Sequence, residues 1–173
     1  MRDFPEEMVA VAALRGPLAL DDALFTARKS NRIAPLQVVR ADRVVGFEHV
    51  RSAAMHAQRA EREGRMHAKT LEVEFLRYLA ATRQIADAIA KMGLDADAPA
   101  PAVVVAALGP KRLDALQHFV HSLGLVEDDA VADASAQKLA GFGVTEAMLA
   151  ATTPERRVDL ALEMVALVDV ART

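Results

Sequence analysis

Residues 72–93, with the sequence EVEFLRYLAATRQIADAIAKMG, decide how the middle of this chain folds. Two sets of apolar residues repeat at helical spacing. The first starts just before the stretch and contains Leu71, Phe75, Tyr78 and Leu79, and the second contains Ile85, Ile89 and Met92. The polar pair Arg83-Gln84 lies where the two patterns meet, after Thr82, whose hydroxyl can cap the second helix. We therefore predict two consecutive helices, the first from Thr70 and the second ending at Gly93, with a polar joint between them.

The chain on either side of this stretch alternates between short apolar runs and helical patterns. Three runs predict β-strands, at residues 8–14, 33–40 and 102–108, and the first is apolar enough for both its faces to be buried. Helical spacing predicts helices over residues 20–30, 47–63, 110–123, 134–140, 145–150 and 154–168. These elements predict an α/β fold with a small mixed β-sheet covered by helices, and a largely helical middle and C-terminal part. At 173 residues, we expect one domain over 1–173.

The helix predicted over residues 47–63 carries a row of small residues. They are spaced by four, three and four positions, and they are Ala53, Ala57, Ala60 and Gly64. Such a row lets another helix approach closely.

The last predicted helix has two apolar rows. One contains Val158, Ala161, Leu162 and Val165, and the other contains Leu160, Met164 and Leu167. One row is enough to pack a helix on its own core. The second row indicates either complete burial or a surface for another protein.

Positive charge is concentrated in the middle of the chain. Residues 28–91 contain 13 Lys and Arg against 7 Asp and Glu, although the whole chain carries a net charge of −3. Clustered cations favour a polyanionic partner, because phosphate contacts release counterions. The alternative is that these arginines only solvate long helices. With one Tyr and no Trp, a base-stacking platform for single strands is not expected.

The residue patterns associated with catalysis are missing from the sequence. His118 and His121 are three residues apart on a predicted helix, but no third metal ligand is indicated. His49 and His56 share a helical face, where we expect them to pack. No glycine-rich loop leads from a strand into a helix, no serine has a nucleophile-elbow context, and cysteine is absent. We predict a protein that is not an enzyme and that uses neither a metal nor another cofactor.

Glu74 is the carboxylate with the most unusual surroundings, since it lies next to an apolar helical face. It could be an acid with a perturbed pKa. We expect instead a buried ion pair with an arginine such as Arg77 or Arg83.

The stretch 72–93 resembles the signature of the kinase-binding small subunit of the KEOPS complex, the TPRKB or PRPK-binding protein family, in its archaeal type. The residues that carry the resemblance are Glu74, Leu76, Tyr78-Leu79, Arg83-Gln84-Ile85, Ala88-Ile89 and Gly93. Residues 141–145 (GFGVT) and 163–170 (EMVALVDV) are similar to the closing blocks of that family. Residues 102–109 and 124–129 are similar in pattern, whereas residues 1–40 share only the hydrophobic pattern.

The resemblance implies a noncatalytic KEOPS subunit that binds the kinase/ATPase subunit of the complex and recruits tRNA by its 3′ CCA end for threonylcarbamoyladenosine modification. The residues then expected to contact tRNA are Arg59, Lys69, Arg77, Arg83, Gln84 and Lys91. Those expected to contact the kinase are Leu160, Met164, Leu167 and Val170. Arg83-Gln84 at a helix start could equally have a purely structural capping role.

Two other functions are compatible with the same sequence. One is a protein-interaction adaptor that does not bind RNA. The other is a small-molecule-binding regulatory α/β domain, which would need convergent polar residues in an apolar pocket. The sequence indicates no such set, so we expect no small-molecule substrate.

We expect a cytoplasmic protein without a membrane partner. The N-terminal residues MRDFPEE are charged and contain a proline, which does not fit a signal peptide. No apolar run approaches the ~18 residues that are needed to span a bilayer.

Overall fold

The computed structural model describes residues 1–30 and 33–170. The apolar run near the N-terminus forms the strand β2 (Val9–Leu18), which is central to the sheet. Residues 9–14 are completely buried, so both faces of this strand are covered, as the sequence predicts.

The sheet has the strand order β1-β2-β4-β3, with β1 at Arg2–Phe4, β3 at Leu36–Arg40 and β4 at Ala100–Leu108. A further short strand, β5 (Val126–Glu127), pairs with β2 opposite Leu14 and Arg15. Every pairing in the described part of the chain is antiparallel. The α/β class is therefore confirmed, but the expected mixed sheet is wrong. Hydrophobic alternation is the same for both strand directions, so the sequence pattern does not distinguish them.

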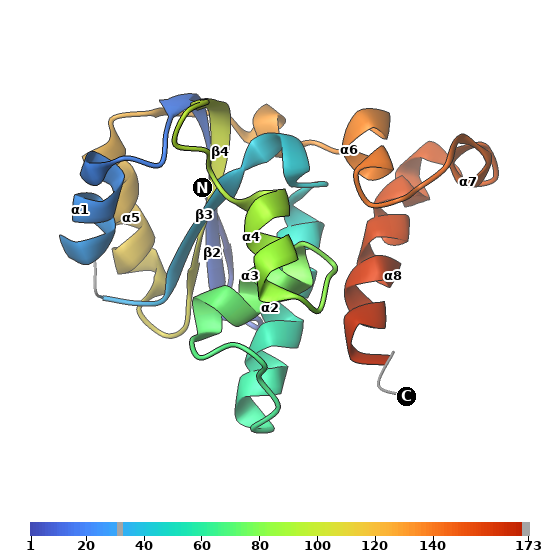
Figure 1. The fold of residues 1–173 in the computed structure, drawn as a ribbon, viewed down its shortest axis with the longest axis horizontal. Coiled ribbons are helices and arrows are strands. Elements are labelled where there is room, and N and C mark those ends of the chain that lie inside the picture. The colour runs from blue at the N-terminus through green and yellow to red at the C-terminus, as the bar shows by residue number, and fades with distance from the viewer. Residues whose placement is uncertain (31–32, 171–173) are drawn as a thin grey trace. The chain divides into compact units, whose positions relative to one another are not determined.

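Two helices pack with the sheet, α1 (Asp22–Ser30) and α5 (Arg112–Leu123). Figure 1 shows them side by side next to the strands. Alternate residues of β2, β3 and β4, such as Leu14, Val38 and Val105, form one apolar cluster with Leu24 of α1 and Phe119 of α5. The apolar residues of α5, which recur at helical spacing, therefore pack on the face of the sheet formed by alternate residues of its strands.

The remaining helices are α2 (Phe47–Arg62), α3 (Leu71–Leu79), α4 (Ile85–Met92), α6 (Ala136–Ala140), α7 (Glu146–Ala150) and α8 (Arg157–Val170). Short 3-10 turns occupy Ala41–Arg43, Asp129–Ala132 and Pro154–Arg156. Helix α2 contacts both α3 and α8. Its small residues Ala53, Ala57 and Ala60 are completely buried, which confirms that this row is a packing face, whereas Gly64 lies beyond the helix and is exposed.

Contacts divide the described chain into two compact units. One consists of Met1–Asp42 and Gly93–Ala132 and contains the sheet, and the other consists of Arg43–Met92 and the chain from Asp133 onward and is helical. The expectation of one domain over residues 1–173 stays a prediction. Within the described residues, no helix is long and apolar enough to cross a membrane.

Candidate functional site

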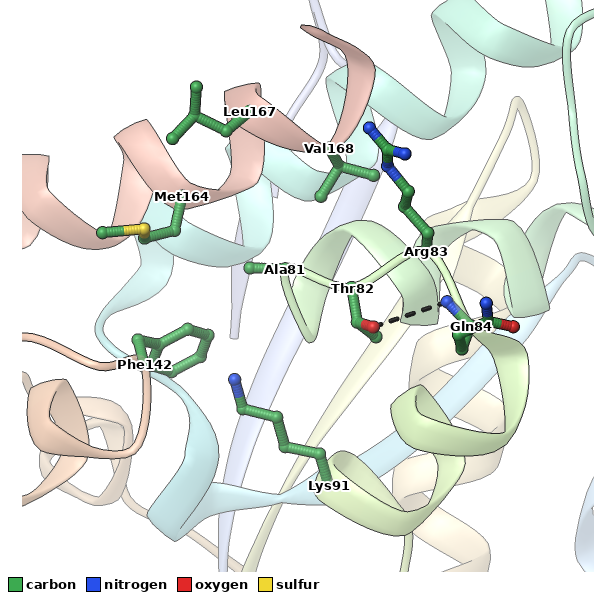
Figure 2. Close-up of a pocket in the computed structure, with 9 residues that line it drawn as sticks. All are labelled: Ala81, Thr82, Arg83, Gln84, Lys91, Phe142, Met164, Leu167 and Val168. Carbon is green, nitrogen blue, oxygen red and sulfur yellow. Dashed lines mark hydrogen bonds between the residues drawn. The ribbon is translucent and has the colours of Figure 1, made fainter. Parts of the chain in front are cut away.

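A groove of about 420 Å³ opens in the helical unit at the joint between α3 and α4. Its lining comes from that joint, from α4, from the turn after α6 and from α8, and consists of Ala81, Thr82, Arg83, Gln84, Lys91, Phe142, Met164, Leu167 and Val168. Figure 2 shows the polar joint residues and the apolar residues of α8 around the same space. The structure therefore brings together three residues predicted to contact tRNA and two predicted to contact a kinase.

The joint has a tight and strained backbone. Ala81 adopts a left-handed conformation with a φ of 52°, which costs an alanine roughly 1–2 kcal/mol. The Ala81 amide donates to the Tyr78 carbonyl, and the Thr82 amide donates to the Arg77 carbonyl at 3.1 Å. Helix α4 begins at Ile85, so Gln84 and not the predicted Thr82 precedes its first residue. The Thr82 hydroxyl accepts from the Gln84 amide at 3.4 Å and supports the turn (Figure 2).

Arg77 does not lie on the surface, and its predicted contact with tRNA is wrong. The side chain is 1% exposed and forms an ion pair with Glu74, which is fully buried. The C-terminal part of α3 is buried on every side, since Glu74 and all residues from Phe75 to Leu79 are buried, and Arg77 lies one turn after Glu74 on the same helical face. The buried ion pair that the sequence suggested for Glu74 is thereby confirmed, with Arg77 as its partner.

Lys91 of α4 projects into the groove with its ammonium group held from two sides. The Nζ atom donates to the Ala80 carbonyl at 3.0 Å and lies 3.9 Å from the centre of the Phe142 ring. Burial lowers the pKa of Lys91, and the positive charge of Arg43 lowers it further. The lysine thus satisfies a carbonyl at the end of α3 while its charge remains at the groove.

Arg83 and Gln84 are exposed at the polar end of the groove. Among the described residues, none pairs with the Arg83 guanidinium. Its five donors are therefore available to a ligand, and their planar arrangement suits a phosphate or a carboxylate.

The other two predicted tRNA contacts lie on the same unit but outside the groove lining. Arg59 is exposed near the end of α2, where its Nε atom pairs with Glu63 at 3.1 Å. Lys69 is exposed in the loop before α3. Glu63 also pairs with Arg65, so one carboxylate offsets part of the charge of two arginines.

Helix α8 divides its two apolar rows between the core and the surface. Ala161, Val165 and Val168 are buried. Met164 is half-buried, whereas Leu167 is 52% exposed and Val170 is 69% exposed. Leu160 packs partly against the cluster of Leu139 and Phe142, and it lines a separate depression of about 200 Å³. The outer row is therefore available to a partner mainly at its C-terminal end.

A cluster of polar side chains holds the C-terminal end of α8 against α2 and α3. Asp169 accepts hydrogen bonds from the Tyr78 hydroxyl at 2.6 Å and from His56 Nδ1 at 3.1 Å, and Arg65 lies 3.7 Å away. Burial alone would raise the pKa of Asp169, but the hydrogen bonds from Tyr78 and His56 outweigh it and hold the pKa below its usual value. The Tyr78 ring also stacks on His56. Sequence reasoning missed this cluster, since its partners are far apart in the chain.

The other histidines with a sequence-based expectation lie outside this polar cluster. His49 is buried at the start of α2, as the packing prediction expected, and its ring contacts Phe142 edge-on. His118 and His121 are exposed on α5. Sequence reasoning also missed Phe142, which lies in the GFGVT block and forms part of the groove wall.

The groove thus combines Arg83, whose guanidinium has no partner among the described residues, and the Gln84 amide with an apolar edge of α8. A family model described as kinase binding protein CGI-121 matches residues 18–147. The chain belongs to this family of kinase-binding proteins. The match confirms the resemblance to the TPRKB family that residues 72–93 show. No curated protein matches the chain.

Proposed function

We propose that this chain is a noncatalytic KEOPS subunit that binds the kinase/ATPase subunit of the complex and recruits tRNA through its 3′ CCA end. The recruited tRNA is then modified to threonylcarbamoyladenosine by the partners, in the cytoplasm. The family supports the kinase partner. The observation that carries the RNA partner is the unpaired Arg83 guanidinium, placed beside Gln84 and Lys91 in an open groove.

The two partners use different residues of the helical unit in this proposal, although some of these residues line the same groove. Arg83 and Gln84 contact phosphates or base edges of the single-stranded 3′ end, and Lys91 adds positive charge to the groove. Arg59 and Lys69 contact phosphates farther from the end. The exposed Leu167 and Val170 of α8, with Met164, contact the kinase.

The proposal is tested by measuring the affinity of the purified protein for a tRNA transcript as a function of salt. About four phosphate contacts should give a slope of log affinity against log salt near −3, because each contact contributes roughly 0.7 to 0.9. We expect an affinity in the micromolar range, since only one tyrosine is available for stacking. Removing the CCA end should weaken binding.

Two substitutions distinguish a specific RNA contact in the groove from a general effect of net charge. Arg83→Glu should weaken binding and flatten the slope by at least the ~0.7 of one single-strand contact. Arg156→Glu is the matched control, because it makes the same change in net charge at an exposed position outside the groove lining. It should leave the affinity close to that of the original protein.

The outcomes distinguish three functions. Binding of the kinase subunit without retention of tRNA leaves the adaptor without RNA binding. Equal affinity for intact and trimmed tRNA would contradict recruitment through the CCA end. A melting temperature that rises with a small metabolite, in the absence of both partners, would favour the small-molecule-binding domain. Binding of kinase and of intact tRNA supports the proposal.

A further inference from the structure

The buried carboxylate Glu74 joins two segments that both carry residues of the proposed RNA surface. Its Oε2 atom accepts from the backbone amides of His67 at 3.0 Å and Ala68 at 2.8 Å. Its Oε1 atom accepts from the guanidinium of Arg77. The carboxylate therefore holds the loop in which Lys69 lies and also holds the arginine of α3.

Arg77 in turn forms hydrogen bonds to the main chain of the joint between α3 and α4. Its Nε atom donates to the carbonyl of Arg83 at 2.9 Å, and its own carbonyl accepts from the amide of Thr82. One buried side chain thus contacts the main chain of the exposed residue that faces the groove. Ala81, in its left-handed conformation, lies within the loops that both hydrogen bonds close, and such a conformation persists only where its surroundings determine it strongly.

Stability alone does not explain this arrangement. A buried ion pair loses so much solvation that well-packed apolar residues of similar volume are often as stable or more stable. An apolar pair at residues 74 and 77 would fill the space, but it would give no donor to the Arg83 carbonyl and no acceptor to the amides of His67 and Ala68. The ion pair therefore supplies directed hydrogen bonds to the main chain of the loop before α3 and of the joint between α3 and α4.

We propose that the Glu74–Arg77 ion pair is the positioning element of the groove, and that Arg77 acts on a partner through Arg83, whose main chain it holds. Arg77 is a positioning residue, since it is buried and does not itself touch the ligand. The part of this inference that concerns RNA rests on the proposed function. The part that concerns the conformation of the joint does not.

The test is a double-mutant cycle with tRNA. The variant Glu74→Leu/Arg77→Met replaces the pair by apolar side chains and leaves no buried charge without a partner. In the original background it should lower the affinity for a tRNA transcript about tenfold. In the Arg83→Ala background the same pair of substitutions should lower the affinity clearly less, because the effect through Arg83 is gone and only the effect on the loop of Lys69 remains. Arg77→Lys with Glu74 retained should recover part of the affinity, since the ammonium group can still donate.

Equal losses in both backgrounds would show a general structural effect and overturn the inference, as would full affinity of the apolar variant. Hydrogen exchange tests the same inference without RNA. The amides of residues 81–84 should exchange at least tenfold faster in the apolar variant, while those of α8 stay protected. Unchanged exchange at the joint would also overturn it. If the original protein does not bind tRNA but the joint amides respond as expected, the proposed RNA function fails and the positioning role stands.

Discussion

His49 shows how burial fixes the protonation of a side chain in this protein. Its ring is completely buried, and its Nδ1 atom accepts a hydrogen bond from the Val45 amide at 3.2 Å. The proton of the neutral ring is therefore on Nε2. Burial lowers the pKa of His49 to about 4, and the positive charge of Lys91 acts in the same direction.

This pKa predicts a loss of stability in mild acid. The neutral ring is favoured in the folded state, whereas an unfolded histidine titrates near 6.5. The contribution of His49 to the free energy of unfolding is thus fully present above about pH 6.5 and is lost as the pH falls towards 4. At 1.36 kcal/mol per pKa unit the loss amounts to about 3 kcal/mol. Urea denaturation at several pH values measures it.

Two variants isolate this effect from that of the carboxylates. In His49→Asn the amide oxygen can accept from the Val45 amide without titrating, so the pH dependence between 6.5 and 4 should be smaller by about the same 3 kcal/mol. His118→Asn, at an exposed position of α5, should keep the pH profile of the original protein. A His49→Asn profile that parallels the original would show that the ring is protonated without cost in the folded state.

Helix α8 is the element whose two faces differ most clearly in burial. Its buried row packs on the core of the helical unit, and Asp169 ties its end to Tyr78 and His56. The outer row at Leu167 and Val170 is exposed, and an exposed apolar row on a well-anchored helix suits a partner surface. The structure thus excludes complete burial of the second row, because Leu167 is exposed, and contact of this row with a partner protein stays a prediction.

The exposed row predicts that Leu167→Glu weakens binding of the kinase subunit. A charge in a desolvated interface should cost about 3 kcal/mol, which is roughly a hundredfold in affinity. Unfolding should stay cooperative, since the Leu167 side chain is 52% exposed. Isothermal titration with the kinase subunit, in the absence of RNA, measures the effect.

The neighbouring position provides the control for that substitution. Ala166 is also exposed on α8, but it does not line the groove and does not belong to the outer apolar row. The Ala166→Glu variant should therefore bind the kinase subunit like the original protein. Loss of folding in Leu167→Glu, or unchanged affinity, would show that this row is not the kinase surface.

At the scale of the whole molecule, the proposed role is that of a subunit that acts on its partners. The purified protein should neither hydrolyse ATP nor modify tRNA, and it should raise the activity of the kinase subunit when the two are mixed. Phosphate release, measured with each protein alone and with both, tests this prediction. Turnover by the isolated chain that disappears on changing Glu74 or His118 would contradict it.

Local sequence patterns determined much of this protein. The helices, the strands β2 and β4 and the polar joint near residue 83 follow from spacings over a few residues, because backbone geometry repeats every 3.6 residues in a helix and every two in a strand. The signature in residues 72–93 also indicated the family. The strands β1 and β5 were not predicted, since two or three residues are too few to show a period.

Only the tertiary structure decided which charged residues are buried and which are exposed. Arg77 and Arg83 are similar in type and close in sequence, yet one is buried against Glu74 and the other is exposed at a groove. The meeting of Arg83 with Met164 and Leu167 was likewise unpredictable, because these residues are about eighty positions apart. The physical reason is that periodicity fixes the direction of a side chain relative to its own helix, whereas its neighbours depend on how separate helices pack.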